Sequence, residues 1–432
     1  MMRDFYSEAL RVSEALRVSE TLKTYETPKT SEALRASEAL NAPEAPKAST
    51  TPKLSISRRR LVDGKLLRCG YTTGTCSAAA AKAATEMLLG QRLVREISIS
   101  IPSGESLILK VQNASFDEDT ASCAIEKNSG DDPDITNGVL VYATAARIQY
   151  GIDIDGGEGV GRVTKPGLDQ PVGSAAINSV PRSMINRAIE SVCEKYYYKN
   201  GIYVVISIPG GQELAKRTFN PRLGIEGGLS ILGTSGIVEP MSNTALNGAI
   251  RAELQVLAAT GEKRLLLTIG NHGECFARKV LSLSLHNHIK CGNFIGETIT
   301  AAIETGFKSI LVVGHIGKLV KMGLGMTNTH SDYGDGRIES LIACALRVGA
   351  DIELLRRLDE CVTTEDAVSR LRESGLLPYV MENLGFRIED TLKRHSFTGV
   401  KTNYVCFIDD EVLAQSPNAE KTIAEWKSYP ND

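Results

Sequence analysis

Hydrophobic and polar positions follow different patterns in the two halves of the folded chain. In the first half an alanine-rich stretch at 75–89 predicts a helix, and a second helix is expected at 182–198. Short stretches that alternate or run apolar predict strands at 95–101, 106–112, 120–127, 138–148 and 202–208. Because helices and strands do not alternate regularly here, we expect an α+β fold for this half.

The second half carries continuous apolar runs between helical patterns. The runs at 264–271, 309–315 and 403–408 are typical of strands in a parallel sheet with both faces covered. Helices are expected at 243–259, 295–305, 317–324, 336–346, 351–358, 364–374 and 377–394. We therefore predict an α+β domain over 61–250 and an α/β domain with a mainly parallel sheet over 251–432.

Residues 1–60 differ from the rest of the chain. From Ser7 onward they repeat a six-residue unit, SEALRV and its variants, later interrupted by Pro28, Pro43 and Pro46. Six residues advance about 600° around a helix, so the leucines would form no continuous stripe. We interpret residues 1–60 as a low-complexity, disordered tail.

Composition narrows the function classes. Hydrophobic residues make up 42% and charged residues 23% of the 432 residues, and the net charge is −3, which argues against a nucleic-acid partner. No apolar run is long enough for a membrane span, so no membrane association is expected. The nine cysteines include no C-x-x-C pair, which favours a reducing cytoplasm and no metal site.

Two polar stretches of the first half carry candidate chemistry. Thr72, Thr73 and Thr75 lie at the start of the alanine-rich helix, whose N-terminus could bind an anion or could simply be capped by them. The carboxylates of the stretch GDDPDITNG at 130–138 could hold a cation, orient a polar substrate, or form a solvated turn. These carboxylates are Asp131, Asp132 and Asp134.

A third stretch, 216–242, is rich in glycine and proline. It is too long for an ordinary turn, and loops of that length are usually functional. Its apolar residues require burial, so a flexible linker is disfavoured. Its polar candidates are Arg217, Asn220, Arg222, Ser230 and Thr234.

The ends of the predicted parallel strands form a fourth polar region. Glycine there permits close approach of a ligand, and asparagine can bond ribose or adenine edges. No phosphate loop is present, because Gly314 to Lys318 is too short and Leu319 replaces the required hydroxyl residue. A nucleoside without a polyphosphate fits better. The candidates are Gly270, Asn271, Gly292, Asn293, Phe294, Gly296, Gly314 and His315.

Taken together, these stretches resemble the cobalt-precorrin-5B C1-methyltransferase (CbiD) family. The similarity runs in unbroken order over about 65–410, with a mild departure at 321–324. It is carried by GYTTGTCSAAAAKAA at 70–84, GDDPDITNG at 130–138, GRVTKPGLDQPVGSAAINSVPRSMI at 161–185, TFNPRLGIEGGLSILGTSGIVEPMS at 218–242, KCGNFIGETI at 290–299, VVGHIGKLVKMGLGMTNTHS at 312–331 and DGRIE at 335–339.

The resemblance implies a reaction: methylation of C1 of cobalt-precorrin-5B by S-adenosylmethionine, in anaerobic cobalamin biosynthesis. Cobalt would then enter only with the substrate, and contacts with other enzymes of the pathway would be transient. A first domain like the second domain of ribosomal protein S5 and a nucleoside-binding second domain are also implied. A non-catalytic corrinoid carrier and a nucleotide-dependent small-molecule kinase are the alternatives.

The implied ligands suggest roles for individual residues. The residues at the ends of the predicted parallel strands would bind the cofactor. The substrate would be faced by Thr72, Thr73 and Thr75, by the carboxylates of 130–138 and by the stretch 216–242. The substrate's many carboxylates would be met by cations. Candidate cations are Arg68, Lys165, Arg182, Arg217, Arg222 and Lys318. If a proton moves during the reaction, His330 or Asp132 is the expected carrier.

Deletion of residues 1–60 should leave the methyl-transfer rate unchanged, because every candidate residue lies beyond the repeat. Comparing turnover of the full-length and truncated proteins tests this expectation. A large loss of turnover in the truncated protein would assign the tail a role in the reaction.

Overall fold

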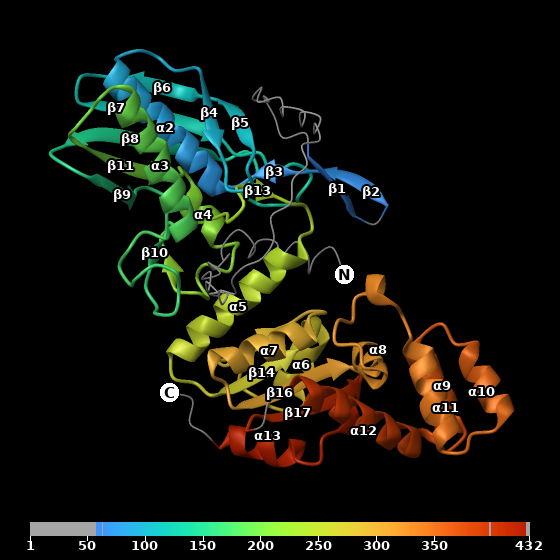
Figure 1. Ribbon diagram of the computed structural model, residues 1–432. Coiled ribbons are helices and arrows are strands. Elements are labelled where there is room, and N and C mark those ends of the chain that lie inside the picture. Colours follow the sequence, from blue (N-terminus) through green and yellow to red (C-terminus); the bar gives the residue numbers. More distant parts are fainter. Residues whose placement is uncertain (1–57, 63, 397–398, 429–432) are drawn as a thin grey trace, which may run out of the picture.

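The computed structural model describes residues 58–62, 64–396 and 399–428, and it forms two mixed α/β halves joined by one helix (Figure 1). The predicted disordered tail lies almost entirely outside the described residues. A hairpin of β1 (Arg59–Val62) and β2 (Lys65–Arg68), which we did not predict, leads into the first half.

The first half is built on a five-stranded mixed sheet. Its order is β6-β7-β8-β11-β9, and β11 pairs antiparallel with β8 and parallel with β9. The strands are β6 (Gln112–Phe116), β7 (Thr120–Glu126), β8 (Leu140–Ile148), β9 (Ile152–Gly156) and β11 (Gly201–Ser207). A separate hairpin pairs β4 (Glu96–Ser100) with β5 (Ser106–Lys110).

Helix α2 (Thr73–Gly90) packs on this sheet and on α3 (Ser179–Lys195). Its alanines explain the close packing, because six of them are fully buried and small side chains let backbones approach. These alanines are Ala78, Ala79, Ala80, Ala81, Ala83 and Ala84. The predicted alanine-rich helix is therefore confirmed as the centre of the first core.

The 216–242 stretch is largely irregular but well packed. It follows α4 (Gly211–Ala215) and contributes two short strands, β12 (Ile225–Glu226) and β13 (Ile237–Val238). These pair with β10 (Arg162–Val163) and β3 (Gly70–Tyr71). The predicted burial of its apolar residues is confirmed, as shown by Leu229, Ile231, Leu232 and Ile237.

The second half contains the predicted parallel sheet. Its order is β15-β14-β16-β17-β18, with four parallel strands and β18 antiparallel at one edge. The strands are β14 (Arg264–Thr268), β15 (His288–Lys290), β16 (Ser309–His315), β17 (Lys401–Ile408) and β18 (Glu411–Gln415). Successive residues of β14 alternate between two cores, because Leu266 lies in one and Leu265 and Leu267 lie in the other.

Helices cover both faces of this sheet. Helix α6 (Gly270–Lys279) and α13 (Ala419–Lys427) pack on the face of Leu266, and α7 (Ile295–Thr305) and α12 (Leu377–His395) pack on the other. Helices α8 (Ile316–Leu319), α9 (Arg337–Arg347), α10 (Ile352–Asp359) and α11 (Thr364–Glu373) form one end of this half (Figure 1). No helix in the described part of the chain has the length and apolar character needed to cross a bilayer.

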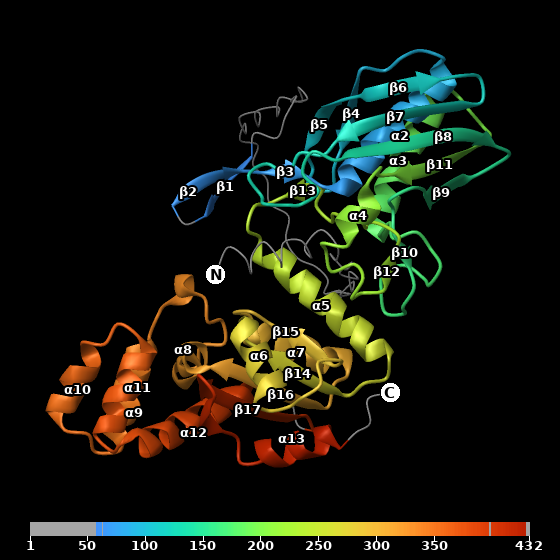
Figure 2. The ribbon, with the colours of Figure 1, turned by 180° about the vertical axis from the view of Figure 1, so that it is seen from behind.

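Helix α5 (Asn243–Ala259) joins the halves, and Figure 2 shows it between them. Ala249, Ala252 and Val256 are buried in a cluster with residues of the first half, whereas Leu254 belongs to the core of the second. The domain boundary that we placed at residue 250 therefore falls inside a helix that both halves share.

Four elements of the second half were not predicted: α6, β15, β18 and α13. The apolar run that we extended to residue 271 ends as a strand at Thr268, and α6 begins at Gly270. The sequence of α6, GNHGECFARK, contains two glycines and has low helix propensity, so tertiary packing stabilises it instead.

Replacing Ala80 by Leu should destabilise the fold by about 1–3 kcal/mol, because the added volume cannot fit beneath α2. Urea unfolding measures this change. Ala424→Leu on the exposed side of α13 is the matched control and should change the stability by less than about 0.5 kcal/mol. Equal effects of the two substitutions would contradict the packing argument.

Candidate functional site

A crevice is expected where β14 and β16 end side by side. From β14 the chain crosses to β15 on one side, and β16 lies on the other side, so the direction of winding reverses between β14 and β16. Ligands of open α/β sheets bind at the carboxyl ends of strands at such a point. In the fourth polar region of the sequence, Gly270 and Asn271 follow β14, Gly314 and His315 end β16, and the other candidates follow β15.

Three of the predicted cofactor residues border this point. Gly270 has a φ of +72°, and a Cβ added there would meet no atom within 4 Å, so it faces open space. Asn271 follows it. The ring of His315 lies 6.2 Å from the ring of His272 and edge-on to Phe407. Burial lowers the pKa of His315, which favours a neutral imidazole.

A polar network holds Asn293 beside the same edge. Its Oδ1 accepts hydrogen bonds from Lys318 Nζ at 3.1 Å and from Thr329 Oγ1 at 3.0 Å. Lys321 Nζ donates to the carbonyl of Thr329 at 3.3 Å. Burial, followed by the charge of Lys321, lowers the pKa of Lys318. Asn293 and Lys318, predicted as separate ligands, are in contact, and Lys321 and Thr329, which the sequence did not single out as ligands, belong to the same network.

His330 continues this network along the chain. It is 9% exposed, and its Nδ1 accepts a hydrogen bond from the backbone N–H of Asp332 at 3.2 Å. His330 directly follows Thr329 of the Asn293 network in the second half, whereas Asp132 lies in the loop 130–138 of the first half.

The remaining residues of the predicted cofactor set contribute to packing. Phe294 is buried, and a Cβ on Gly314 would lie 2.6 Å from Ile269 Cδ1. A Cβ on Gly296 would lie 2.6 Å from Thr327 Oγ1. Gly292 adopts a φ of +57°, directly after Cys291, which is fully buried and donates its backbone N–H to Thr268. The packing of the chain gives Phe294, Gly296 and Gly314 a structural role, and their contact with a cofactor stays a prediction.

The threonines at the N-terminus of α2 are covered by the chain. Thr72 caps the helix by accepting from the N–H of Thr75, and Thr75 Oγ1 donates to the carbonyl of Gly236. Thr73 Oγ1 accepts from the N–H of Leu232. Because all three threonines are buried, the stretch 232–236 closes the helix N-terminus, which differs from the open anion site that we considered.

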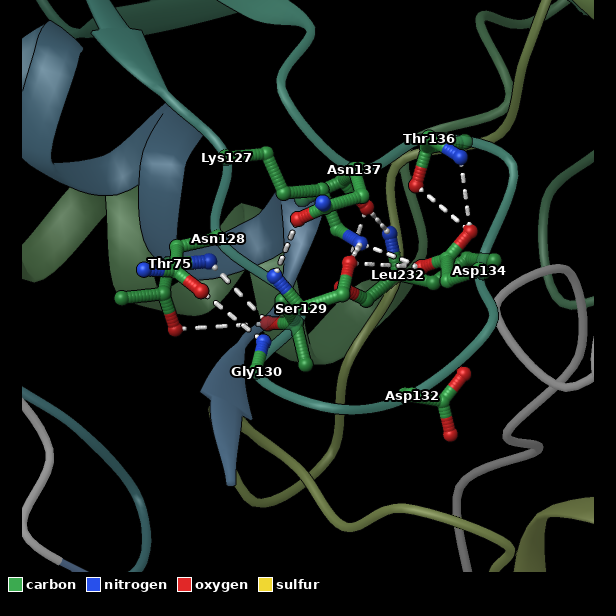
Figure 3. A network of polar contacts seen from close by, with 12 residues as sticks. Thr75, Lys127, Asn128, Ser129, Gly130, Asp132, Asp134, Thr136, Asn137 and Leu232 are labelled. Carbon is green, nitrogen blue, oxygen red and sulfur yellow. Dashed lines mark hydrogen bonds and ion pairs between the residues drawn. The ribbon is translucent and has the colours of Figure 1, made fainter. Parts of the chain in front are cut away.

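The carboxylates of 130–138 have three different environments, and Figure 3 shows two of these carboxylates, Asp132 and Asp134. Asp134 is buried and pairs with Lys127, with Ser129 and Thr136 completing its hydrogen bonds. Asp131 accepts from Arg68, whose hydrogen bonds hold the pKa of Asp131 below its usual value. These pairs fix the stretch as an ordered loop.

Asp132 lies between the other two carboxylates along the chain, and it is largely buried. Its Oδ2 accepts from the backbone N–H of Met241 at 3.3 Å. This contact ties the loop 130–138 to the end of the 216–242 stretch, so two of the predicted substrate-facing stretches lie side by side.

The other predicted substrate residues divide by exposure. Arg182 is half-buried and donates to the carbonyls of Ile154 and Ile177, which gives it a structural use. Asn220 Oδ1 and Ser230 Oγ are buried and, within the described residues, have no hydrogen-bond partner. Thr234 is half-buried. Three cations are exposed: Lys165, Arg217 and Arg222.

Two models of a single family match this chain. The CbiD model matches residues 60–240, and the model of the CbiD C-terminal domain matches residues 328–417. The chain therefore belongs to the CbiD family.

Two relatives are named cobalt-precorrin-5B C(1)-methyltransferase. The protein of Ruminiclostridium cellulolyticum is 44% identical and covers 80% of this chain and 90% of its own length. That of Alkaliphilus metalliredigens is 42% identical and covers 86% of this chain and 98% of its own length. A crystal structure of the cobalamin biosynthesis protein CbiD from Archaeoglobus fulgidus is 27% identical over 65% of this chain and 87% of its own, with a TM-score of 0.36.

Replacing Lys127 by Met should destabilise the protein by about 3–5 kcal/mol, because Asp134 would then remain charged and unpaired in the interior. Chemical unfolding measures this loss. Lys216→Met, which removes an exposed pair with Glu213, is the control and should cost less than about 1 kcal/mol. The double substitution Lys127→Met with Asp134→Leu should recover much of the stability, and a cost for Lys127→Met no larger than the control's would contradict a stabilising role.

Proposed function

We propose that this protein transfers a methyl group from S-adenosylmethionine to C1 of cobalt-precorrin-5B, giving cobalt-precorrin-6A and S-adenosylhomocysteine. The observation that carries the proposal is membership of the CbiD family together with relatives of that name, which align over most of both chains. None of the nine cysteines, all of which the structure describes, forms a disulfide, which is compatible with a cytoplasmic enzyme.

The ends of β14 and β16 are suited to the adenosine of the cofactor. Gly270 leaves space beside the backbone, which a side chain at this position would fill. The Oδ1 of Asn293 accepts hydrogen bonds from Lys318 and Thr329, so the side-chain N–H groups are the donors that Asn293 can offer to the cofactor. When bound, the cofactor supplies an electrophilic methyl group on a sulfonium. We infer that the second half is a nucleoside-binding α/β domain and that the first resembles the second domain of ribosomal protein S5.

The work of the chain is then to align and shield the reactants. The sulfonium methyl is already activated, so the rate depends on orienting it toward the carbon nucleophile and on excluding water. Lys318 and Thr329 hold Asn293 in one orientation, which fixes a contact to the cofactor. We retain His330 and Asp132 as the proposed proton carriers, should the substrate lose a proton.

The substrate is proposed to lie against the first half, along the loops 130–138 and 230–242. Its carboxylates would be met by exposed cations, of which Arg68, Lys165 and Arg217 are the candidates, rather than by the covered threonines. The Asp132–Met241 contact joins these loops, so they offer one surface. The unpartnered polar atoms of Asn220 and Ser230 belong to the same 216–242 stretch.

Anaerobic incubation of the protein with cobalt-precorrin-5B and methyl-labelled S-adenosylmethionine tests the reaction. Label should appear on C1 of the ring in stoichiometric amount with S-adenosylhomocysteine. Binding of both ligands without label on the ring would make the protein a carrier, and tight ATP binding without S-adenosylmethionine binding would favour a kinase.

Asn293→Ala should raise the KM for S-adenosylmethionine about tenfold. The substitution removes one or two hydrogen bonds to the cofactor and the hydrogen bond from Lys318 that orients the side chain. Steady-state kinetics measure the change. Asn418→Ala, at an exposed position before α13, should leave the KM unchanged. An unaltered KM in the Asn293 variant would place the cofactor elsewhere.

A further inference from the structure

A carboxylate lies on an apolar face of α5. Glu253 follows Ala249 by one helical turn and precedes Val256 by another, and both neighbours are buried. Glu253 itself is half-buried, and within the described residues it has no hydrogen bond or ion pair. Leaving a carboxylate without a partner at such a position is costly, so the residue requires another explanation.

Glu253 faces a hollow between the two halves. The wall from the first half is formed by Arg222 and Leu223, and the remaining walls come from α5, α6 and the segment that includes β15. Figure 2 shows α5 and β15 next to each other. The residues that line the hollow are Arg222, Leu223, Glu253, Val256, Leu257, Glu274, Leu285, His286 and His288.

Arg222 supplies the opposite charge on the facing wall. Its guanidinium lies over the ring of Phe219, 5.3 Å from the centroid, and within the part of the chain that the structure describes no carboxylate pairs with it. Its positive charge nevertheless acts on Glu253 and Glu274. The hollow therefore presents a cation and an anion that do not neutralise each other by direct contact.

The hollow adjoins the strand ends proposed for the adenosine. Glu274 pairs with Lys290 Nζ at 3.0 Å, and the same Nζ donates to Asn271 Oδ1 at 2.7 Å. Asn271 follows Gly270 at the crevice. Lys290 thus connects the wall of the hollow with Asn271 after β14, and a ligand longer than a nucleoside could reach both places.

We propose that this hollow binds the α-amino acid end of S-adenosylmethionine, with Arg222 pairing with its carboxylate and Glu253 with its ammonium group. The zwitterion matches the two separated charges of the walls, and the apolar lining suits the methylene chain. The inference rests on the proposed function. Arg222, which the sequence suggested as a ligand of the tetrapyrrole, is therefore proposed to bind the cofactor instead.

The environment of Glu253 adds a dependence on pH. Burial raises the pKa of Glu253 to about 7, although the charges of Arg222 and Lys290 act in the opposite direction. The ammonium group of the cofactor binds the ionised form of Glu253. The affinity for S-adenosylmethionine should therefore increase as the pH rises through 7 and decrease as the pH is lowered. A nucleoside without the amino acid should show no such dependence.

The other titratable groups of the hollow are accounted for. Burial lowers the pKa of His288 to about 4, so it stays neutral over this range. Burial opposes ionisation of Glu274, but the hydrogen bond from Lys290 holds its pKa below the ordinary value. His286 is exposed and faces Glu262. Because His286 is untouched in a Glu253 variant, loss of the pH dependence in that variant would identify Glu253 as its source.

Calorimetric titration with two nucleosides tests the proposal. S-adenosylhomocysteine carries the amino acid end, and 5′-methylthioadenosine lacks it. Arg222→Met and Glu253→Gln should each weaken binding of S-adenosylhomocysteine about tenfold or more and leave 5′-methylthioadenosine unchanged. Between pH 6 and 7 the wild-type affinity for S-adenosylhomocysteine should rise several-fold, and Glu253→Gln should abolish this rise.

Arg251→Met and Glu304→Gln are the matched controls, because these residues form an exposed pair with each other away from the hollow. They should not change the affinity for either nucleoside. Unchanged binding of S-adenosylhomocysteine to the Arg222 and Glu253 variants, or an equal loss for both nucleosides, would overturn the proposal. If the wild-type protein binds neither nucleoside, the proposed function fails, and the inference fails with it.

Discussion

The burial of two faces of α5 in two different cores is the constraint on which the arrangement of the protein depends. Ala249 and Val256 pack toward the first half, and Leu254 packs into the second. A helix that loses apolar contacts on either face would leave a large surface exposed to water. The two halves are therefore not independent units on a linker, and residues from both can contribute to one ligand site.

The first half supplies ordered loops rather than flexible ones. Lys127 and Asp134 lie together in the interior, and Thr73 holds the backbone of Leu232. Loops whose polar groups are satisfied by the protein keep one conformation, which lowers the entropy lost when a large ligand binds. This order suits a rigid macrocycle. The same packing buries the hydroxyls of Thr72, Thr73 and Thr75 at the N-terminus of α2.

The sequence predicted much of the fold because its strongest patterns are local. The alanine-rich helix and the apolar strands 309–315 and 403–408 agree with α2, β16 and β17. Helix α6 was not predicted because its two glycines give the segment a low helix propensity, and packing on the sheet stabilises it instead.

The site was less accessible to prediction than the fold. Asn293 and Lys318 stood out individually, yet their contact joins positions 25 residues apart and depends on the order of the parallel strands. The pairing of Lys127 with Asp134 could not be predicted, since nothing in the neighbouring sequence indicates that a lysine is fully buried. Glu253 did carry a local signal, a charge between Ala249 and Val256 on an apolar helix face.

Cys291 adjoins Gly292, a residue of the proposed cofactor site. It lies directly before Gly292 at the end of β15, and burial raises the pKa of its thiol to about 12. A thiolate is a strong nucleophile toward a sulfonium methyl, whereas a protonated, inaccessible thiol is not. The fold thus protects its own sulfur from alkylation by the reagent that the neighbouring residues are proposed to hold.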